Sequence, residues 1–279
     1  MRKVWINGVI RDETEARVSP FDHGFLVGDG VFETLPAYTG TVFAMRRHWE
    51  RMARGSAVLG IEIPGCEDLR AAADEVLRVN ALEQARVRIT ATGGPSPLGS
   101  EKGNEGSTVV IAAAAMPVWG AAAPVATVPF CRNERGALSG LKTTSYGENV
   151  LALMEAKKRG ASEAIFGNTR GELCEGTGSN IFLVRGEEIL TPPLDSGCLA
   201  GVTRGLVLEL AREIGVRVRE TPIPFGELQA VDEAFLTSTT REVQPISAID
   251  GRLLSRAPGE LTARLAAGFR RLVAEQPDP

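Results

Sequence analysis

An uncharged segment with two prolines, Met116 to Pro124 (MPVWGAAAP), divides the chain into two parts of unequal length. Proline fixes its own φ angle and has no N–H to donate, so such a stretch is typical of a connection between folded regions. At 279 residues, the chain also exceeds the size at which one core usually gives way to two. We therefore predict a small N-terminal domain over residues 1–117, a linker over 118–124 and a larger C-terminal domain over 125–279.

Strand and helix patterns alternate in the first 115 residues. The Asn7-Gly8 pair between two short apolar runs predicts an antiparallel hairpin, because this pair readily adopts the positive φ angles of a two-residue turn. Apolar residues at helical spacing predict helices, and shorter apolar runs predict strands. The predicted strands are residues 4–6, 9–10, 31–38, 41–45, 86–91 and 108–115, and the predicted helices are residues 46–59 and about 69–77. The pattern indicates an α+β lobe.

The second part of the chain begins near Val125 and also contains helix and strand patterns. Two of its helical patterns stop at a glycine, as helices commonly do. The predicted helices are residues 146–159, 202–214 and 261–274, and the predicted strands are residues 164–166, 180–184 and 234–238. This arrangement indicates a larger lobe of mixed α and β structure.

The charge balance gives no sign of a polyanionic partner. Lys and Arg number 31 against 35 Asp and Glu, a net charge of −4, whereas nucleic acids and anionic membranes attract basic surfaces. Four separate cysteines without a CxxC pair, and only two histidines, argue against zinc and redox-dithiol sites. No stretch approaches the roughly 20 apolar residues of a membrane span, and the first residues turn polar too early for a signal peptide. We expect a cytoplasmic protein with small-molecule partners and no bound metal.

Two familiar catalytic signatures are incomplete. The glycine pairs of residues 28–30 and 176–178 each lack the third glycine of a dinucleotide-binding turn. Ser139 and Lys142 match the SxxK spacing of penicillin-binding enzymes, but the SDN and KTG triplets of those enzymes are missing. Neither motif supports a function.

Three turns further along the chain make Lys142 a candidate site residue. These are residues 175–180 (EGTGSN), 201–203 (GVT) and 237–240 (TSTT). Backbone N–H groups in such turns and at helix starts bind phosphate, although each turn alone is also consistent with an ordinary loop, and Lys142 alone with a solvated lysine. A lysine for a Schiff base, a glutamate for a ring nitrogen and turns for a phosphate together favour pyridoxal 5'-phosphate as the cofactor.

These motifs resemble those of the class IV aminotransferases, the fold-type IV pyridoxal-phosphate enzymes. The matching segments are Lys142, Glu175 to Phe182 (EGTGSNIF) 33 residues later, Leu199 to Arg204 (LAGVTR), Ser19 to Thr34 (SPFDHGFLVGDGVFET) and His48 to Arg51 (HWER). The resemblance extends from about Val4 to Ile249. It implies a two-lobed fold like that of the D-amino acid aminotransferases, with a small N-terminal α+β lobe and a larger C-terminal lobe, assembled as a homodimer that acts in amino acid metabolism.

The resemblance also implies roles for individual residues. Lys142 would form the Schiff base with pyridoxal 5'-phosphate and carry a proton between the substrate and the cofactor. Glu175 would pair with the ring nitrogen. Arg51 would bind the phosphate, for which its planar fork of donors is suited. The other residues that the resemblance places around the cofactor are Ser179, Asn180, Val202, Thr203, Thr239 and Thr240.

The sequence does not identify the subfamily. Residues 89–106 contain no arginine, unlike the matching loop of D-amino acid aminotransferases, Phe32 replaces their usual tyrosine, and Thr34-Leu35-Pro36 replaces the glycine and arginine usual in branched-chain enzymes. The N-terminal run is most similar to that of the aminodeoxychorismate lyases, which form 4-aminobenzoate and pyruvate.

We expect an aminotransferase that transfers an amino group between a small or hydrophobic amino acid and a 2-oxo acid. The lyase is the first alternative, and a non-catalytic cofactor-binding or scaffold relative is the second. Phe32, Tyr146 and Arg241 are candidate substrate contacts, with helix packing as the structural alternative for Tyr146 and a surface ion pair for Arg241.

Overall fold

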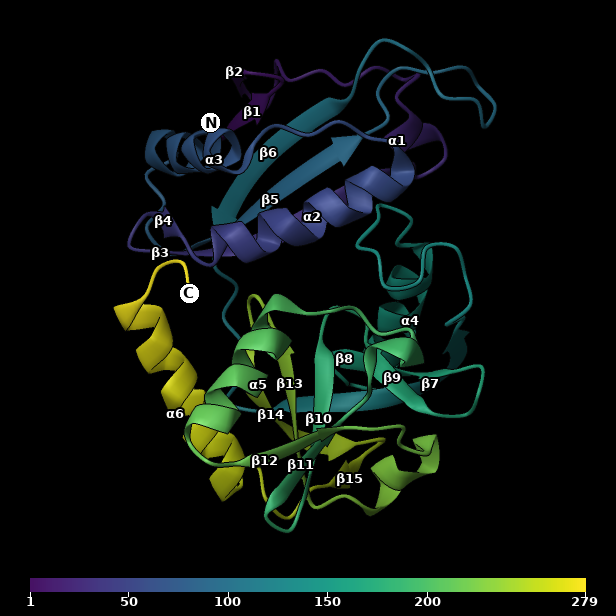
Figure 1. Ribbon diagram of the computed structural model, residues 1–279, viewed down its shortest axis with the longest axis vertical. Coiled ribbons are helices and arrows are strands. Elements are labelled where there is room, and N and C mark those ends of the chain that lie inside the picture. The colour runs from purple at the N-terminus through teal and green to yellow at the C-terminus, as the bar shows by residue number, and fades with distance from the viewer. The chain divides into compact units, whose positions relative to one another are not determined.

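The computed structural model describes residues 1–279, and the chain forms two compact units (Figure 1). Unit 1 contains Met1–Pro117, Leu141–Tyr146 and Gln276–Pro279, and unit 2 contains Val118–Gly140 and Gly147–Glu275. None of the helices is both long and apolar enough to cross a bilayer.

Unit 1 is built on a six-stranded antiparallel sheet in the order β2-β1-β6-β5-β3-β4. Its strands are β1 (Lys3–Ile6), β2 (Val9–Asp12), β3 (Gly30–Tyr38), β4 (Thr41–Val42), β5 (Ala85–Thr92) and β6 (Thr108–Ala115). Helix α2 (Met45–Leu59) packs on β3, helix α3 (Cys66–Val79) packs on β6 and β1, and the short helix α1 (His23–Leu26) precedes β3. The Asn7-Gly8 turn joins β1 to β2 as predicted, with φ angles of 44° and 93°.

The sheet of unit 1 has one face against the helices and one face away from them. Every second residue of β5 is buried in the core shared with α2 and α3, because side chains alternate along a strand. These inward residues are Ala85, Val87, Ile89 and Ala91. In the paired strand β3, Glu33 lies opposite Ile89 and Phe32 lies opposite Thr90. Glu33 therefore faces the helices, and Phe32 shares the other face with Arg88 of β5.

The segment Leu141–Tyr146 belongs to unit 1 because it runs beside the start of β3. The N–H of Phe32 donates to the carbonyl of Lys142 at 2.9 Å, and the N–H of Thr144 donates to the carbonyl of Gly30 at 2.8 Å. A side chain at position 30 would not fit, since a Cβ there would lie 2.8 Å from Thr144 Oγ1. The backbone of β3 thus determines where Lys142 lies in this unit.

Unit 2 is built on a nine-stranded mixed sheet in the order β12-β11-β10-β13-β14-β7-β8-β9, with β15 paired to β14. Its strands are β7 (Ala123–Arg132), β8 (Glu163–Asn168), β9 (Leu173–Gly176), β10 (Asn180–Arg185), β11 (Glu188–Thr191), β12 (Arg217–Glu220), β13 (Glu233–Ser238), β14 (Glu242–Ile249) and β15 (Arg252–Leu253). Its helices are α4 (Gly147–Lys158), α5 (Val202–Glu213) and α6 (Glu260–Glu275), with short 3-10 turns η1 (Leu194–Ser196) and η2 (Phe225–Ala230). Helix α4 packs on β7 and β8, while α5 and α6 contact each other and β13.

The predicted helices and strands agree with the structure to within a few residues, with three informative differences. The strand predicted over residues 41–45 ends at Val42, because the chain already turns into α2 at Met45. The predicted linker, residues 118–124, belongs to unit 2, and β7 already begins at Ala123. The C-terminal domain predicted over residues 125–279 also differs from unit 2, since Leu141–Tyr146 and Gln276–Pro279 join unit 1. Both segments do so through hydrogen bonds to residues far away in the sequence, which a local pattern does not reveal.

Candidate functional site

Lys142 lies among aromatic side chains of unit 1. Its Nζ atom is 4.5 Å from the centroid of the Phe32 ring and 5.7 Å from that of the Tyr146 ring. The two rings meet edge to face with centroids 5.0 Å apart, so within this unit Tyr146 packs on Phe32. Because an amine cation is attracted to aromatic faces, these rings hold the lysine side chain beside the start of β3.

Arg88 is a second cation on the same face of the sheet. Its guanidinium carbon is 3.2 Å from the centroid of the Phe32 ring, and its Nε donates to the Thr90 hydroxyl at 3.3 Å. An arginine and a lysine around one phenylalanine ring form a positively charged aromatic surface, which suits a ligand with a carboxylate and an apolar body. Arg88 was not among the residues predicted from the sequence, although the alternation of β5 could have placed it opposite the core.

Arg51 is held by a buried carboxylate between the sheet and α2. Its Nε and Nη2 atoms donate to Oε1 and Oε2 of Glu33 at 2.7 and 2.6 Å, and Nδ1 of His48 is 2.6 Å from Oε2. Burial alone would raise the pKa of Glu33, but the charges and hydrogen bonds of Arg51 and His48 outweigh it and hold the pKa well below its ordinary value. Burial lowers the pKa of His48, so near pH 7 its neutral ring donates from Nδ1, since a carboxylate only accepts.

The fork between Glu33 and Arg51 fixes the plane of the guanidinium group. Glu33 accepts from two of its nitrogen atoms, and a guanidinium carries five N–H donors in total. Glu33 lies in the segment from Ser19 to Thr34 that resembles the family, but no role was predicted for it. An acidic residue on the inward side of a buried strand, facing an HxxR helix, was the signal that could have revealed it.

Glu175 is held in unit 2 by a backbone amide and an arginine. Its Oε2 accepts from the N–H of Leu199 at 2.9 Å, and its Oε1 is 3.4 Å from Nε of Arg132. Arg132, at the end of β7, also donates through Nη1 to Asn149 at 3.1 Å and lies over the Phe166 ring at 4.3 Å. Both contacts stabilise a negative charge on the Glu175 carboxylate. Sequence reasoning missed Arg132, because its pairing depends on the register between distant strands.

A second buried carboxylate, Glu163, fixes the turn that follows β9. It accepts from the N–H of Thr177 at 3.1 Å, from the Thr177 hydroxyl and from the Ser179 hydroxyl at 3.0 Å. A buried carboxylate needs such donors because it has left water. Ser179, predicted to lie near the cofactor, therefore has a definite role in shaping this turn.

The N-terminus of α5 has the features of an anion-binding site. Its N-cap residue Gly201 provides no side-chain hydrogen bond to the first turn, which contains Val202 and Thr203. The amide of Asn180 donates to the carbonyl of Leu199 at 2.9 Å and so fixes the loop before the helix. A Cβ at position 201 would lie 2.0 Å from Asn180 Oδ1, so a larger residue there would displace the Asn180 amide. First-turn N–H groups and the helix dipole together favour a bound anion.

The turn after β13 contains Thr239 and Thr240, and Trp119 lies beside it. Nε1 of Trp119 donates to Thr240 Oγ1 at 3.3 Å. The hydroxyl of Thr237, at the end of β13, is buried and has no hydrogen-bond partner in the protein. Buried polar atoms are nearly always satisfied, so this orphaned hydroxyl next to a threonine turn is consistent with a ligand site.

Arg241 is engaged by several groups inside unit 2. It donates through Nη2 to the carbonyl of Ser162 at 2.8 Å and through Nη1 to Gln244, its Nε is 3.6 Å from Glu163, and its guanidinium carbon is 3.7 Å from the Trp119 ring centroid. Burial lowers the pKa of Arg241 from its ordinary value. The Arg241 side chain is buried, so its pair with Glu163 is a buried ion pair and not the surface ion pair that was the alternative prediction.

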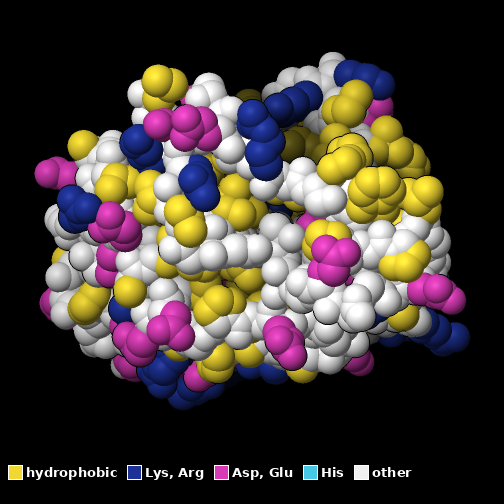
Figure 2. All heavy atoms as spheres, turned by 90° about the horizontal axis from the view of Figure 1, so that it is seen from above, with side chains coloured by type: hydrophobic (Ala, Val, Ile, Leu, Met, Phe, Trp, Pro, Cys, Tyr) yellow, Lys and Arg dark blue, Asp and Glu magenta, His cyan; other side chains and the backbone are white.

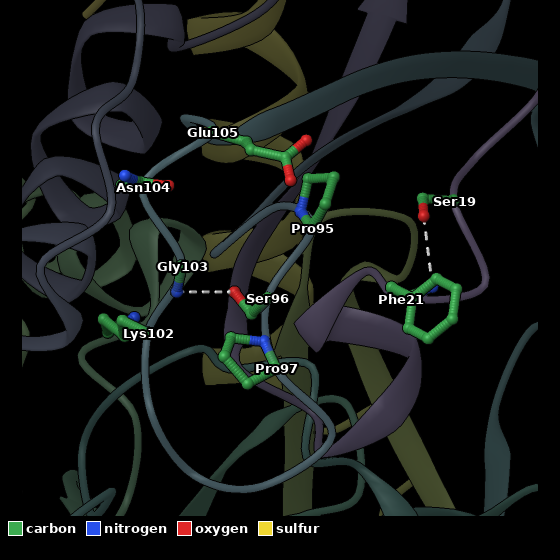
Figure 3. A pocket seen from close by; sticks show the side chains of 9 residues that line it. All are labelled: Ser19, Phe21, Pro95, Ser96, Pro97, Lys102, Gly103, Asn104 and Glu105. Carbon is green, nitrogen blue, oxygen red and sulfur yellow. Dashed lines mark hydrogen bonds between the residues drawn. The ribbon is translucent and has the colours of Figure 1, made fainter.

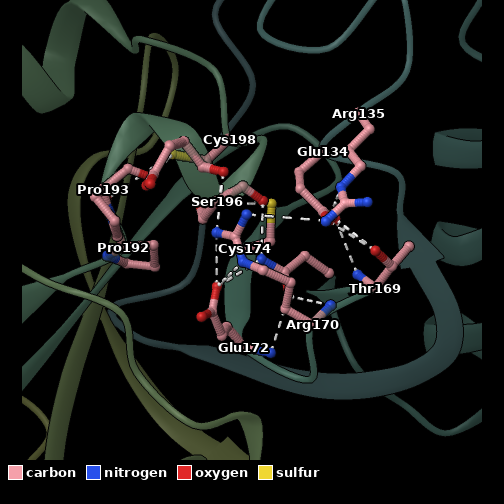
Figure 4. A network of polar contacts seen from close by, with 12 residues as sticks. Glu134, Arg135, Thr169, Arg170, Glu172, Cys174, Pro192, Pro193, Ser196 and Cys198 are labelled. Atoms are coloured by element: carbon pink, nitrogen blue, oxygen red, sulfur yellow. Dashed lines mark hydrogen bonds and ion pairs between the residues drawn. The ribbon is translucent and has the colours of Figure 1, made fainter.

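Glu134 anchors the loop over residues 133–140, which leads to the lysine segment (Figure 4). The hydroxyl and the N–H of Thr169 donate to its carboxylate at 2.7 and 3.1 Å. The network in Figure 4 also contains the buried thiols of Cys174 and Cys198. Burial raises the pKa of Cys198 to about 11 and raises the pKa of Cys174 further, so both are unreactive thiols.

A separate hollow of about 860 Å³ lies in unit 1 (Figure 3). It is formed by Phe21 and the loop over residues 95–105, in which the N–H of Gly103 donates to Ser96 Oγ at 2.9 Å. Exposed apolar side chains are frequent in this part of the sequence, and Figure 2 shows apolar side chains gathered at the right of the face that it displays. None of the predicted site residues lines the hollow.

The structure distributes the predicted residues over both units. Unit 1 brings Lys142, Phe32 and Tyr146 together and holds Arg51 on the helical side of β3. The residues that belong to unit 2 are Glu175, Ser179, Asn180, Val202, Thr203, Thr239, Thr240 and Arg241. Hydrogen bonds to Leu199 connect Glu175 with Asn180 and hence with the start of α5.

Comparison with known proteins identifies the class. The family model for amino-transferase class IV matches residues 30–249. A "Putative branched-chain-amino-acid aminotransferase" of Methanocaldococcus jannaschii is 38% identical, over 96% of this chain and 95% of the relative. D-alanine aminotransferase of Bacillus licheniformis is 30% identical over 98% of both chains. Aminodeoxychorismate lyase of Bacillus subtilis is 31% identical over 96% of this chain and 94% of the relative.

Solved structures agree with this assignment. The branched-chain aminotransferase of Thermoproteus uzoniensis with norvaline has a TM-score of 0.91 and 34% identity, over 99% of this chain and 97% of that chain. The branched-chain amino acid aminotransferase of Escherichia coli has a TM-score of 0.91 and 27% identity, over 97% of this chain and 94% of that chain. The chain therefore belongs to the class IV aminotransferase family, as the motifs predicted, and it is an enzyme of this two-lobed fold. Branched-chain aminotransferases are prominent among its relatives although the residues after Glu33 depart from their usual pattern.

Proposed function

We propose that this enzyme is a pyridoxal-phosphate-dependent aminotransferase that moves an amino group between a small or hydrophobic amino acid and a 2-oxo acid. The observation that carries the proposal is the position of Lys142, whose amine lies 4.5 Å from the Phe32 ring and 5.7 Å from the Tyr146 ring. An amine beside an aromatic surface suits chemistry on an amino acid with an apolar side chain.

The residues present fit pyridoxal 5'-phosphate. The fit rests on the donor set: a lysine amine, a carboxylate whose charge is supported by Arg132 and the Leu199 N–H, a helix start without a side-chain cap, and the orphaned hydroxyl of Thr237. When bound, this cofactor withdraws electrons from the substrate α-carbon. Relatives of known structure carry pyridoxal-phosphate derivatives, which supports the same choice.

The chain's own residues then have distinct tasks. Lys142 would hold the cofactor through Nζ, and its amine, when neutral, would move the α-proton of the substrate. Glu175 would pair with the ring nitrogen and keep it protonated. Arg51 binds the phosphate with donors whose direction Glu33 fixes. The remaining phosphate donors are Val202, Thr203, Thr239 and Thr240, and Ser179 and Asn180 shape the cofactor site.

We assign substrate contacts to Phe32, Tyr146 and Arg88. The two rings meet the side chain of the amino acid, and the Arg88 guanidinium, 3.2 Å from the Phe32 centroid, meets its carboxylate. We assign Arg241 to positioning instead, because Glu163, Gln244, Ser162 and Trp119 engage it.

One experiment tests the proposal against the lyase alternative. Single amino acids of both hands are added to the holoprotein without an oxo acid, and the absorption of the cofactor is followed. We expect conversion to the pyridoxamine form with apolar amino acids. If none of them converts the cofactor while aminodeoxychorismate yields 4-aminobenzoate and pyruvate, the enzyme is the lyase instead.

Lys142→Ala tests the assignment of the lysine, and Lys157→Ala is its matched control. Lys142→Ala should give no conversion with any amino acid. Lys157→Ala, which removes an exposed lysine of α4, should behave as the wild type. Normal turnover by purified Lys142→Ala would contradict the assignment of the lysine. A wild type that never binds pyridoxal 5'-phosphate would instead favour the scaffold alternative.

We also infer that the enzyme is a cytoplasmic homodimer. The family resemblance implies the dimer, and α4 supports it with three exposed apolar side chains, Val150, Leu151 and Met154, at 57%, 52% and 54% exposure, because such a group is typical of a protein interface. All four cysteines are free thiols, which suits a reducing compartment.

A further inference from the structure

Helix α2, which carries His48 and Arg51, begins without the usual stabilising features. Its N-cap residue Ala44 has a left-handed conformation with φ 56° and makes no side-chain hydrogen bond, and its first turn contains no acidic residue. Arg46 and Arg47 stand there instead. Because the N-terminus of a helix carries a partial positive charge and N–H groups without intrahelical acceptors, cationic side chains are unfavourable at this place.

Residues from the other end of the chain supply what α2 lacks. The N–H of Arg46 donates to Oδ1 of Asp278 at 3.1 Å, and the N–H of Ala44 donates to the carbonyl of Pro277 at 2.8 Å. Nε of Arg47 donates to the carbonyl of Pro279 at 2.8 Å. Asp278 thus performs the two tasks of an N-terminal cap, since it accepts a hydrogen bond from the first turn and brings a negative charge to the positive end of the helix.

The same carboxylate of Asp278 also contacts helix α3. Nη2 of Arg70, in α3, donates to Oδ2 of Asp278 at 2.6 Å. Burial alone would lower the pKa of Arg70, but the hydrogen bond and charge of Asp278 outweigh it, so the pKa is raised from its ordinary value. Pro277 and Pro279 flank the aspartate, and their fixed φ angles reduce the entropy lost when the segment is ordered.

We propose that residues 277–279 are the N-terminal cap of α2 and that, through this helix, they position Arg51 for the phosphate of the cofactor. The second part of this statement rests on the proposed function. Asp278 is a positioning residue: it acts through the first turn of α2, and His48, two residues after Arg46, belongs to the Glu33 network that orients Arg51. A frayed first turn would loosen His48 first and Arg51 with it.

Two measurements on Asp278→Ala test the two parts separately. Amide hydrogen exchange should be faster over residues 45–52 by roughly 2- to 30-fold, the range that corresponds to removal of a side-chain cap. The dissociation constant should rise several-fold for pyridoxal 5'-phosphate but stay unchanged for pyridoxal, which has no phosphate. Asp278→Asn, which keeps an acceptor oxygen, should be intermediate in exchange, and Asp12→Ala, which removes an aspartate of β2 paired with Lys3, should match the wild type in both measurements.

Each outcome decides one part. Unchanged exchange over residues 45–52 in Asp278→Ala would overturn the cap. The link to Arg51 would be overturned if exchange is faster but the affinities for pyridoxal 5'-phosphate and pyridoxal fall equally, or if neither affinity falls. A wild type that binds neither form would refute the proposed function, while the exchange measurement would still judge the cap.

Discussion

Replacing Glu33 with glutamine tests the buried network that holds Arg51. Glutamine has the same size but no charge, so the Arg51 guanidinium loses the partner that accepts at 2.7 and 2.6 Å. Both side chains are buried, with Glu33 at 1% and Arg51 at 8% exposure. Removal of one partner of a buried ion pair costs about 3–5 kcal/mol, because the other charge is left uncompensated away from water. Since whole domains are stable by only about 5–15 kcal/mol, this loss is large.

Urea unfolding at pH 7, followed by tryptophan fluorescence, measures the loss. A Trp119→Phe background leaves Trp5 and Trp49, both of which lie in unit 1, so the signal reports the unit that contains Glu33. The matched control is Glu75→Gln. Oε1 of Glu75 is 2.7 Å from Nη2 of Arg78 on the surface of α3, where an ion pair contributes little to stability. We expect a much lower midpoint for Glu33→Gln only.

A second substitution sharpens this prediction. Adding Arg51→Gln to Glu33→Gln removes the uncompensated charge and should restore part of the lost stability, because two neutral amides can hydrogen-bond to each other. Equal unfolding midpoints for Glu33→Gln and Glu75→Gln would show that the network contributes no more than a surface pair, and the reasoning would fail.

Three further predictions concern the other unit, the pH and the assembly. Arg132→Met should lower kcat/KM by roughly 10- to 100-fold in a steady-state assay, since Glu175 loses one charge-assisted contact, and unchanged kinetics would exclude this contact from catalysis. The free energy of unfolding should fall as the pH is lowered below about 6.5, because the lowered pKa of His48 in the folded state means that the unfolded chain binds this proton first. The lowered pKa of Glu33 should add a further loss below about pH 4.5, where the unfolded chain also protonates this carboxylate more readily. His48→Gln should flatten the upper part of this profile in pH-dependent denaturation, and an unaltered profile would speak against it. Leu151→Lys, on the exposed face of α4, should shift the enzyme from dimer to monomer in sedimentation, and an unshifted dimer would place the interface elsewhere.

The sequence by itself determined most of the secondary structure of unit 1, the long helices of unit 2 and the family, whereas the strands β7, β9, β11, β12, β14 and β15 were not predicted. Helix and strand periodicity located α2, α5 and α6 to within a few residues, and the Asn7-Gly8 pair specified the first hairpin, because these signals depend only on neighbouring residues. The motifs around Lys142 and Glu175 were specific enough to identify a class IV aminotransferase, which the comparisons support.

Only the tertiary structure decided which side chains meet. Glu33 faces Arg51 because the register of β3 turns it toward α2, and Arg132 reaches Glu175 because β7, β8 and β9 are neighbours in one sheet. Asp278 caps a helix 232 residues away in the sequence. Such contacts arise from strand order, strand register and the return of distant segments. A local pattern can show that a residue such as Glu33 points inward, but its partner is set only when the whole chain packs.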